Sequence, residues 1–150
     1  LSAEMASAFE EMVESGEVFQ LTAPEDRLGG FADQAVLATE YLRAQRIRER
    51  LCRAFDEWIA PYDAVLTVPT AGPAPPISGA FNGRYSSRSL GGPGNLCGTP
   101  ALVLPTGLTD DKLPTAIQLD GRAYSENRLL AVGSAYQAAT KWHTLYPDQL

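Results

Sequence analysis

The densest group of nucleophilic side chains lies in the segment YSSRSLGG, which places Ser86, Ser87 and Ser89 just before Gly91 and Gly92. A serine hydroxyl attacks a carbonyl carbon when a nearby base takes its proton and backbone N–H groups stabilise the oxyanion. A Gly- and Ser-rich loop can provide both the hydroxyl and the backbone donors. Whether this one acts as a nucleophile depends on the bases that the chain offers.

The sequence offers few bases for such a serine. Lysine serves as a base only when burial makes it neutral, and neither Lys112 nor Lys141 has an apolar setting. Asp110 and Asp111 would also keep Lys112 protonated. His143 is the only histidine, and its place near a predicted helix C-terminus indicates a capping or packing residue. We therefore predict no catalytic residue within this chain.

Two cysteines and a few carboxylates are the remaining candidates for chemistry. Cys97 has no nearby base candidate, so a small buried residue is a simpler interpretation than a nucleophile. Cys52 and Cys97 are too few for a disulfide framework. Two thiols in a reducing, cytoplasmic compartment are the simplest interpretation, and a single bridge is the alternative. Asp110, Asp111 and Asp120 lack metal-ligand spacing, so we expect neither a metal nor a cofactor.

Charge and hydropathy exclude two classes of partner. The 150 residues carry a formal net charge of −6, whereas a nucleic-acid-binding surface needs clustered Lys and Arg to displace counterions. The richest basic stretch, residues 43–53, is interleaved with Glu49 and an apolar stripe, which is typical of a solvated helix face. No apolar run is long enough to span a bilayer, and the acidic first residues are not a secretory signal. We expect no nucleic-acid partner and no membrane partner.

Helices are predicted near both ends of the chain. Residues 3–14 place apolar side chains at helical spacing, and Gly16 is expected to end that helix. Residues 20–31 are rich in Pro and Gly and are predicted to form a loop. The last helix is expected from about Ser125, a suitable N-cap, to about His143.

A longer helix is predicted between these two, from Asp33 to Ile59. Asp33 can cap its N-terminus, and Pro61 ends it because the residue before a proline avoids helical angles. Apolar side chains recur at spacings of three and four and form one stripe, which is expected to lie in the core. The stripe consists of Leu37, Tyr41, Ala44, Ile47, Leu51, Phe55 and Trp58.

Three strands are predicted in the second part of the chain. The apolar run in residues 62–70 suits a strand covered on both faces, as in a parallel sheet with helices above and below. Residues 101–105 form a second buried strand, and residues 115–122 form a third after a turn at 108–114. Residues 78–94 are predicted to be a long loop, and a loop of this length in a compact domain is usually functional or disordered. Helices and strands together predict an α/β chain.

The segment NLCGTPALVLPTGL, residues 95–108, sets glycine and proline on both sides of the second strand. Proline limits the hydrogen-bonded ladder because it has no N–H donor, and glycine lets another backbone or a ligand approach closely. Asn95 can stabilise a turn through its own backbone. Ligands of α/β sheets bind at such loops, although a tight turn into a core strand explains the same residues without a ligand.

This segment is one of several sequence landmarks whose order is typical of a known family. Before it, EYLRAQRIRERL leads into YDAVLTVPT and then into the Pro- and Ala-rich AGPAPP. After it, KLPTAIQLDGR leads into SENRLLAVGSAYQAATKWH. In this order the landmarks resemble the C-terminal third of the amidase signature family, over roughly residues 33–147.

The resemblance implies a portion of an amide-bond hydrolase, folded as part of an α/β/α sandwich with a mixed central sheet flanked by helices. Family members use a serine nucleophile, a second serine in a cis peptide, and a lysine that takes the proton through the second serine. These residues lie upstream of the landmarks, and YSSRSLGG stands at the wrong place in their order to replace them. The chain is then the C-terminal part of one amidase signature domain. It comprises residues 1–31 (helix and loop), 32–60 (long helix) and 61–150 (strands, the pocket loop 78–94 and the last helix).

The resemblance also suggests which residues border a substrate, because the loop 78–94 is expected to form part of the pocket wall. The substrate-binding candidates are Arg88, Gly91, Gly92, Asn95 and Cys97. In family members that transfer ammonia to aminoacyl-tRNA, the residue seven positions before the motif asparagine is acidic, and here it is Arg88. An arginine would repel an ammonium group and favour a carboxylate or a polar acyl group. A solvent-exposed arginine on a mobile loop is the alternative.

Three interpretations of the chain stay open. The first is the C-terminal part of an amidase that acts on a small-molecule amide, with the missing N-terminal part as its partner. The second is a non-catalytic binding or scaffold module, and the third is an aminoacyl-tRNA amidotransferase A-type subunit, against which Arg88 argues weakly. The chain starts at Leu1 inside a predicted helix, which suggests a cut chain, a processed product or a sequence given only in part. Its strands would then expose a sheet edge, so we expect the missing part or a homodimer to cover it.

Overall fold

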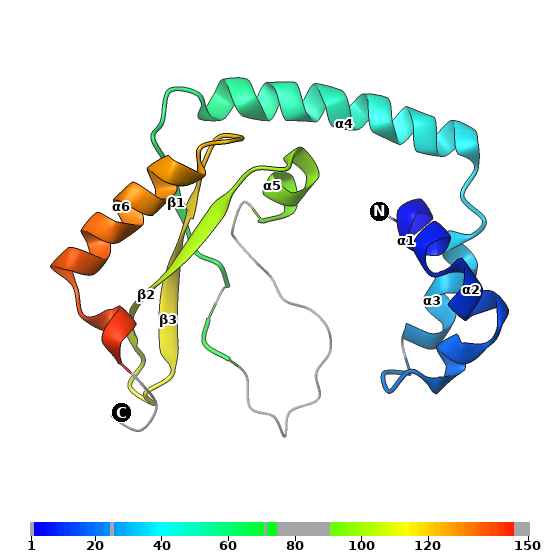
Figure 1. The fold of residues 1–150 in the computed structure, drawn as a ribbon, viewed down its shortest axis with the longest axis horizontal. Coiled ribbons are helices and arrows are strands. Elements are labelled where there is room, and N and C mark those ends of the chain that lie inside the picture. The colour runs from blue at the N-terminus through cyan, green and yellow to red at the C-terminus, as the bar shows by residue number, and fades with distance from the viewer. Residues whose placement is uncertain (1, 25, 71, 75–90, 146–150) are drawn as a thin grey trace. The chain divides into compact units, whose positions relative to one another are not determined.

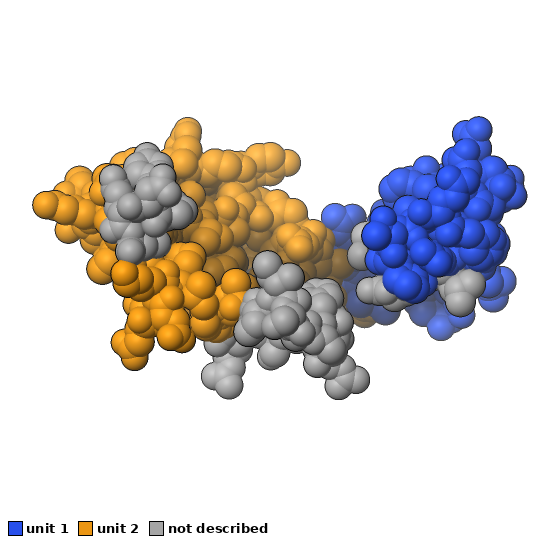
Figure 2. Space-filling model, turned by 90° about the horizontal axis from the view of Figure 1, so that it is seen from below, with its two compact units in different colours: residues 1–49 blue, residues 50–150 orange. Residues whose placement is uncertain are grey.

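Short helices, one long helix and a small sheet make up the computed structural model of the chain, which describes residues 2–24, 26–70, 72–74 and 91–145 (Figure 1). The chain divides into two compact units, Leu1–Glu49 and Arg50–Leu150 (Figure 2). Across the described ranges, every helix is too short or too polar to cross a membrane.

Unit 1 begins with the helix predicted for residues 3–14, which is divided into α1 (Ser2–Ala8) and α2 (Glu10–Glu14). Gly16 ends α2 as predicted. Its φ of 81° lies in the left-handed region, which glycine adopts without steric cost. A short 3-10 helix, η1 (Glu17–Gln20), follows directly.

The loop predicted for residues 20–31 is wrong in its second half, because α3 (Asp26–Asp33) lies there. Gly30 explains the difference. A Cβ atom at Gly30 would lie 2.7 Å from Cγ2 of Val13, which is buried, so the missing side chain lets α3 approach α2 closely. Burial of Val13 outweighs the weak helix propensity of glycine. Asp33 ends α3 and does not cap the long helix, which was a second wrong prediction.

The long helix α4 (Ala38–Ile59) ends where Pro61 predicts but begins five residues later than predicted. Its first turn is closed by Leu37, whose carbonyl accepts hydrogen bonds from the backbone N–H groups that follow. The stripe predicted to lie in the core is mostly exposed: Leu51 is 48% exposed and Trp58 is 49% exposed. Ile59, at the end of the helix, is fully buried.

The sheet consists of β1 (Val65–Thr67), β2 (Ala101–Leu108) and β3 (Pro114–Asp120), in the order β1-β3-β2. The three predicted strands and the α/β class are confirmed. Both pairs of neighbouring strands are antiparallel, so the parallel pairing expected for residues 62–70 is wrong in the described sheet. Its first strand is also only partly covered, since Leu66 is 63% exposed.

β2 continues beyond Pro105, where the sequence predicts its end. The register shifts between Pro105 and Gly107, so the strand bulges and then pairs again as far as Leu108. A bulge tolerates a proline because the N–H group that proline lacks is not needed in the ladder there. The predicted turn between β2 and β3 is confirmed, and the backbone N–H of Thr109 donates to the Leu113 carbonyl at 2.9 Å.

α6 (Glu126–Ala139) packs on one face of the sheet and closes the core of unit 2. The buried centre of this core consists of Leu104, Leu119 and Leu129. A Cβ atom at Gly133 would lie 2.6 Å from Cδ2 of Leu102, so this glycine allows the helix to lie close to β2. The helix ends before the predicted His143, because residue 140 adopts an extended backbone conformation. The 3-10 helix η2 (Trp142–Thr144) follows.

Candidate functional site

The residues predicted to bind substrate lie mostly on α5 (Gly91–Cys97), a short helix just before β2. Gly91, Gly92, Asn95 and Cys97 all belong to it. The end of the predicted loop is therefore helical, and Asn95 lies within a helix instead of stabilising a turn. Arg88 lies outside the described residues.

The motif that follows Asn95 is explained by the way α5 ends. Gly98 has a φ of 69°, and the backbone N–H of Thr99 donates to the Gly94 carbonyl at 3.0 Å. A left-handed residue after the last helical turn and a hydrogen bond that spans it form a Schellman C-cap, which glycine favours. The glycine of Asn-Leu-Cys-Gly therefore has a structural role in turning the chain from α5 into β2.

α5 offers different surroundings to its residues. Gly92 and Asn95 are exposed, and a Cβ atom added at Gly92 would meet no atom within 4 Å. Cys97 is half-buried, and the carbonyl of the preceding Leu96 lies 3.8 Å from Sγ of Cys52 on α4. One side of α5 thus rests against α4, whereas Gly92 and Asn95 are accessible.

A buried polar group, which the sequence analysis missed, lies on the sheet face opposite α6. Asp120 and Gln118 are 2% and 6% exposed. Oγ1 of Thr67 donates to Oδ2 of Asp120 at 2.7 Å, and Nε2 of Gln118 donates to Oδ1 of the same carboxylate at 2.7 Å. The signal was available, because two polar residues two positions apart on a strand share a face opposite the apolar Leu119.

This polar group and α5 meet at the same end of the sheet. Asp120 pairs in register with Val65 on one side and Ala101 on the other. Next to it, the backbone N–H of Gly121 donates to the Pro100 carbonyl at 3.0 Å, between α5 and β2. The carboxylate therefore joins β1 to β3 where the segment from α5 enters the sheet.

Two exposed ion pairs tie the surrounding elements together. Nε and Nη2 of Arg122, just after β3, donate to the two carboxylate oxygens of Asp56 on α4, both at 2.6 Å. These hydrogen bonds, and then the positive charge of Arg122, lower the pKa of Asp56 below its ordinary value although partial desolvation opposes the shift. Arg128 of α6 pairs with Asp63 at 2.9 Å, just before β1. Landmarks far apart in sequence are thus joined through their charged residues.

Comparisons with known proteins bear on this arrangement. The family model described as Amidase matches residues 4–130. The A-type subunit of glutamyl-tRNA(Gln) amidotransferase from Chloroflexus aggregans is 42% identical over 111 residues, which cover 72% of this chain and 22% of that protein. This chain belongs to the amidase family. The same subunit from Legionella pneumophila (strain Corby) is 37% identical to this amidase-family chain over 117 residues, 73% of this chain and 23% of that protein.

Solved structures show the fold of the amidase family in this chain. A structure described as a crystal structure of amidase has a TM-score of 0.77 and 23% identity, over 93% of this chain and 33% of its own. A structure described as an inhibitor-bound vestigial protein complex that reveals the evolutionary origins of an s-triazine catabolic enzyme has a TM-score of 0.75 and 21% identity, over 92% of this chain and 32% of its own. The α/β fold and the family resemblance are confirmed. The chain spans about a fifth of the curated relatives' length.

The base candidates of this amidase-family chain lie away from the polar group. Lys112 is exposed in the turn between β2 and β3, where its φ is 60°. Lys141 and His143 are exposed after α6. Within the described ranges, no three His, Cys, Asp or Glu side chains gather as metal ligands. The side chains of both lysines are thus exposed to solvent and lie outside any apolar pocket of the described residues.

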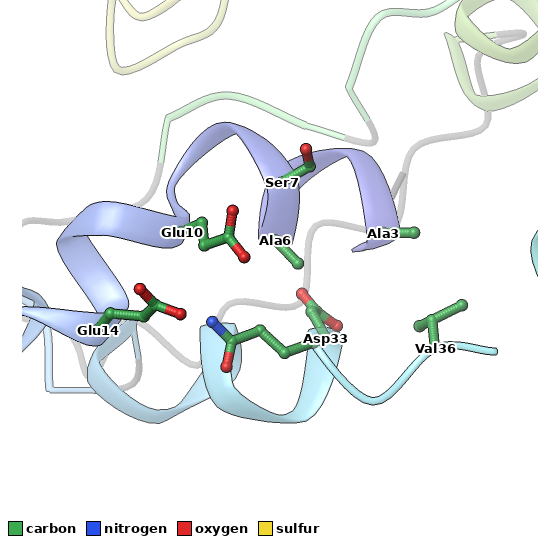
Figure 3. Close-up of a pocket in the computed structure, with 8 residues that line it drawn as sticks. Ala3, Ala6, Ser7, Glu10, Glu14, Asp33 and Val36 are labelled. Atoms are coloured by element: carbon green, nitrogen blue, oxygen red, sulfur yellow. The ribbon is translucent and has the colours of Figure 1, made fainter. Parts of the chain in front are cut away.

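The groove in Figure 3 lies in unit 1. It has a volume of about 400 Å³, and carboxylates line much of it. Its lining residues are Ala3, Ala6, Ser7, Glu10, Glu14, Asp33, Gln34 and Val36. The groove is therefore acidic and belongs to the N-terminal helices of the amidase-family chain.

Proposed function

We propose that this chain is the C-terminal part of an amidohydrolase that cleaves a carboxylic amide to an acid and ammonia or an amine. The observation that carries the proposal is the match to an amidase over 93% of this chain but only 33% of the amidase. The serine, cis-serine and lysine chemistry of the family would come from residues outside this chain. This part supplies sheet and pocket wall, works without a cofactor, and acts in the cytoplasm.

Exposed apolar side chains in unit 2 support the proposal that another part of the enzyme packs on this chain. Leu66 and Val103, on two strands of the sheet, are 63% and 51% exposed, and Leu51 and Trp58 on α4 are about half exposed. Large apolar side chains that gather at a surface mark places that another part of a protein covers. In the proposed enzyme the catalytic part covers it. For the isolated chain we propose a homodimer, which gel filtration distinguishes from a monomer of 16.1 kDa.

The proposed pocket wall is α5, where Gly92 and Asn95 are exposed. Gly92 has open space in place of a side chain, so a substrate can approach its backbone. The Asn95 amide can donate and accept hydrogen bonds. The proposed role of Asp120 is to hold β1 and β3 in register next to this wall, through its bonds to Thr67 and Gln118.

A chimera tests this function. In an amidase of the same fold, residues 4–130 of this chain would replace the matching C-terminal segment, and hydrolysis of that amidase's own amide substrate would be followed by ammonia release. We expect a folded chimera that is labelled by a fluorophosphonate at the host serine and releases ammonia. A host truncated before the segment is the control and should do neither. A folded chimera whose host serine resists the fluorophosphonate would contradict the proposal.

The second candidate is an amidotransferase A-type subunit, which 42% identity to the corresponding subunit of glutamyl-tRNA(Gln) amidotransferase favours. Arg88 argues weakly against it, because the family's amidotransferases are expected to carry an acidic residue there. Exchange of Arg88 for Ala in the chimera, assayed on an anionic and a neutral amide, tests this point. The amidase proposal expects a larger loss of kcat/KM on the anionic amide, and equal losses would exclude a substrate-binding role for Arg88.

A further inference from the structure

We propose that Cys52 and Cys97 form a reversible disulfide that fastens α5 to α4 when the protein meets a peroxide. Both cysteines are thiols in this structure, and both are half-buried in unit 2. They lie on two elements that touch, since Cys52 Sγ is 3.8 Å from the Leu96 carbonyl oxygen. The proposal concerns the pair itself and does not rest on the proposed amide hydrolysis.

The contact at Leu96 limits how far apart the two cysteines lie. The Leu96 carbonyl belongs to the peptide unit that ends at Cys97, so its oxygen is about 2.8 Å from the Cys97 Cα atom. The sulfur of Cys52 therefore lies within about 7 Å of that Cα atom. Rotation about χ1 moves a cysteine sulfur by about 3 Å without any movement of the backbone. Side-chain rotation can therefore shorten the distance between the two sulfurs, which a disulfide requires to be about 2 Å.

Burial favours a bond within the chain over a bond between chains. A half-buried thiol is accessible to a small oxidant, whereas a second protein molecule reaches it less easily. Gly98 follows Cys97 directly with a φ of 69°, so the chain turns out of α5 immediately after this cysteine. The crosslink would then fix α5, which carries Gly92 and Asn95, against α4.

Hydrogen peroxide is the oxidant that converts the two thiols into the proposed disulfide. One cysteine, as its thiolate, attacks a peroxide oxygen. The O–O bond breaks, hydroxide leaves and the sulfur becomes a sulfenic acid. The second thiolate attacks that sulfur, the S–O bond breaks and a second hydroxide leaves as the disulfide forms. The two thiol protons and the two hydroxides give two waters, and a dithiol reductant reverses the reaction.

Peroxide treatment of the full 150-residue chain, followed by intact-mass measurement, tests the proposal. We expect a loss of about 2 Da, because two hydrogens leave, and a fall of at least about tenfold in maleimide labelling of both thiols. Dithiothreitol should restore both. Trypsin should release peptide 51–53 joined to peptide 89–112 from the oxidised chain and not from the reduced chain.

Cys52→Ser and Cys97→Ser are the matched control variants, and circular dichroism checks that each is folded. In either variant we expect no loss of 2 Da, because the chain then holds a single thiol and cannot form a disulfide within itself. Three results would overturn the proposal: both thiols stay reactive in the oxidised wild-type chain, each sulfur gains oxygen independently, or the only disulfide joins two chains.

Discussion

The buried carboxylate of Asp120 should stabilise unit 2 through its two hydrogen bonds, and its removal allows this to be measured. Asp120→Ala removes the acceptor for Thr67 and Gln118, each of which donates to it at 2.7 Å. Hydrogen bonds to a charged group contribute about 1.5–3 kcal/mol each, and Gln118, only 6% exposed, would lose its partner. The carboxylate's own desolvation cost opposes these terms.

The expected balance for Asp120→Ala is a loss of about 2–3 kcal/mol in the free energy of unfolding, or about 30- to 150-fold in the unfolding equilibrium. Urea unfolding followed by circular dichroism measures it. Asp120→Asn is the matched control, because its carbonyl oxygen still accepts from Gln118 and its amide can bond to the Thr67 hydroxyl. We expect Asp120→Asn to lower the free energy of unfolding by less than half as much as Asp120→Ala does. An Asp120→Ala chain as stable as the wild type would refute this account.

Three further predictions concern stability. Gly133→Ala forces a methyl group to within 2.6 Å of a leucine side chain on β2 and should cost about 1 kcal/mol net, whereas Gly92→Ala, with open space around it, should not lower the Tm. Gly98→Ala should cost about 1–2 kcal/mol in urea unfolding, because its φ of 69° disfavours any Cβ. The lowered pKa of Asp56 means that its pairing with Arg122 stabilises the fold above the ordinary carboxyl pKa of about 3.9 and is lost as the pH falls through the lower folded-state value. Asp56→Asn should remove this part of the acid dependence, and 1 M salt should weaken it in the wild type.

The strands and the turn between them were predictable because their signals are local. Alternation of side chains located β3, and proline and glycine located the turns on either side of β2. The bulge was not predictable, because Pro105 also fits the end of a strand. The pairing of Gly107 with Thr115 and of Leu108 with Pro114 across the sheet shows that β2 continues.

The helices that were missed contain glycines whose roles depend on distant residues. Gly30 indicates a loop in the sequence, yet it allows α3 to pack on Val13. α5 has the sequence GGPGNLC, whose helix propensity is poor, so tertiary surroundings decide its conformation. The polar group at Asp120 needs Thr67, which is 53 residues away. A single sequence gives no indication that these two residues meet.

The most direct test of the central claim is the reactivity of the isolated 150-residue chain toward a fluorophosphonate, measured by intact mass. We expect no adduct and no ammonia release from a panel of amides, because the reactive serine and its lysine are proposed to lie in the rest of the enzyme. A stoichiometric adduct on Ser86, Ser87 or Ser89 would contradict this account, because it would show an activated nucleophile within the chain.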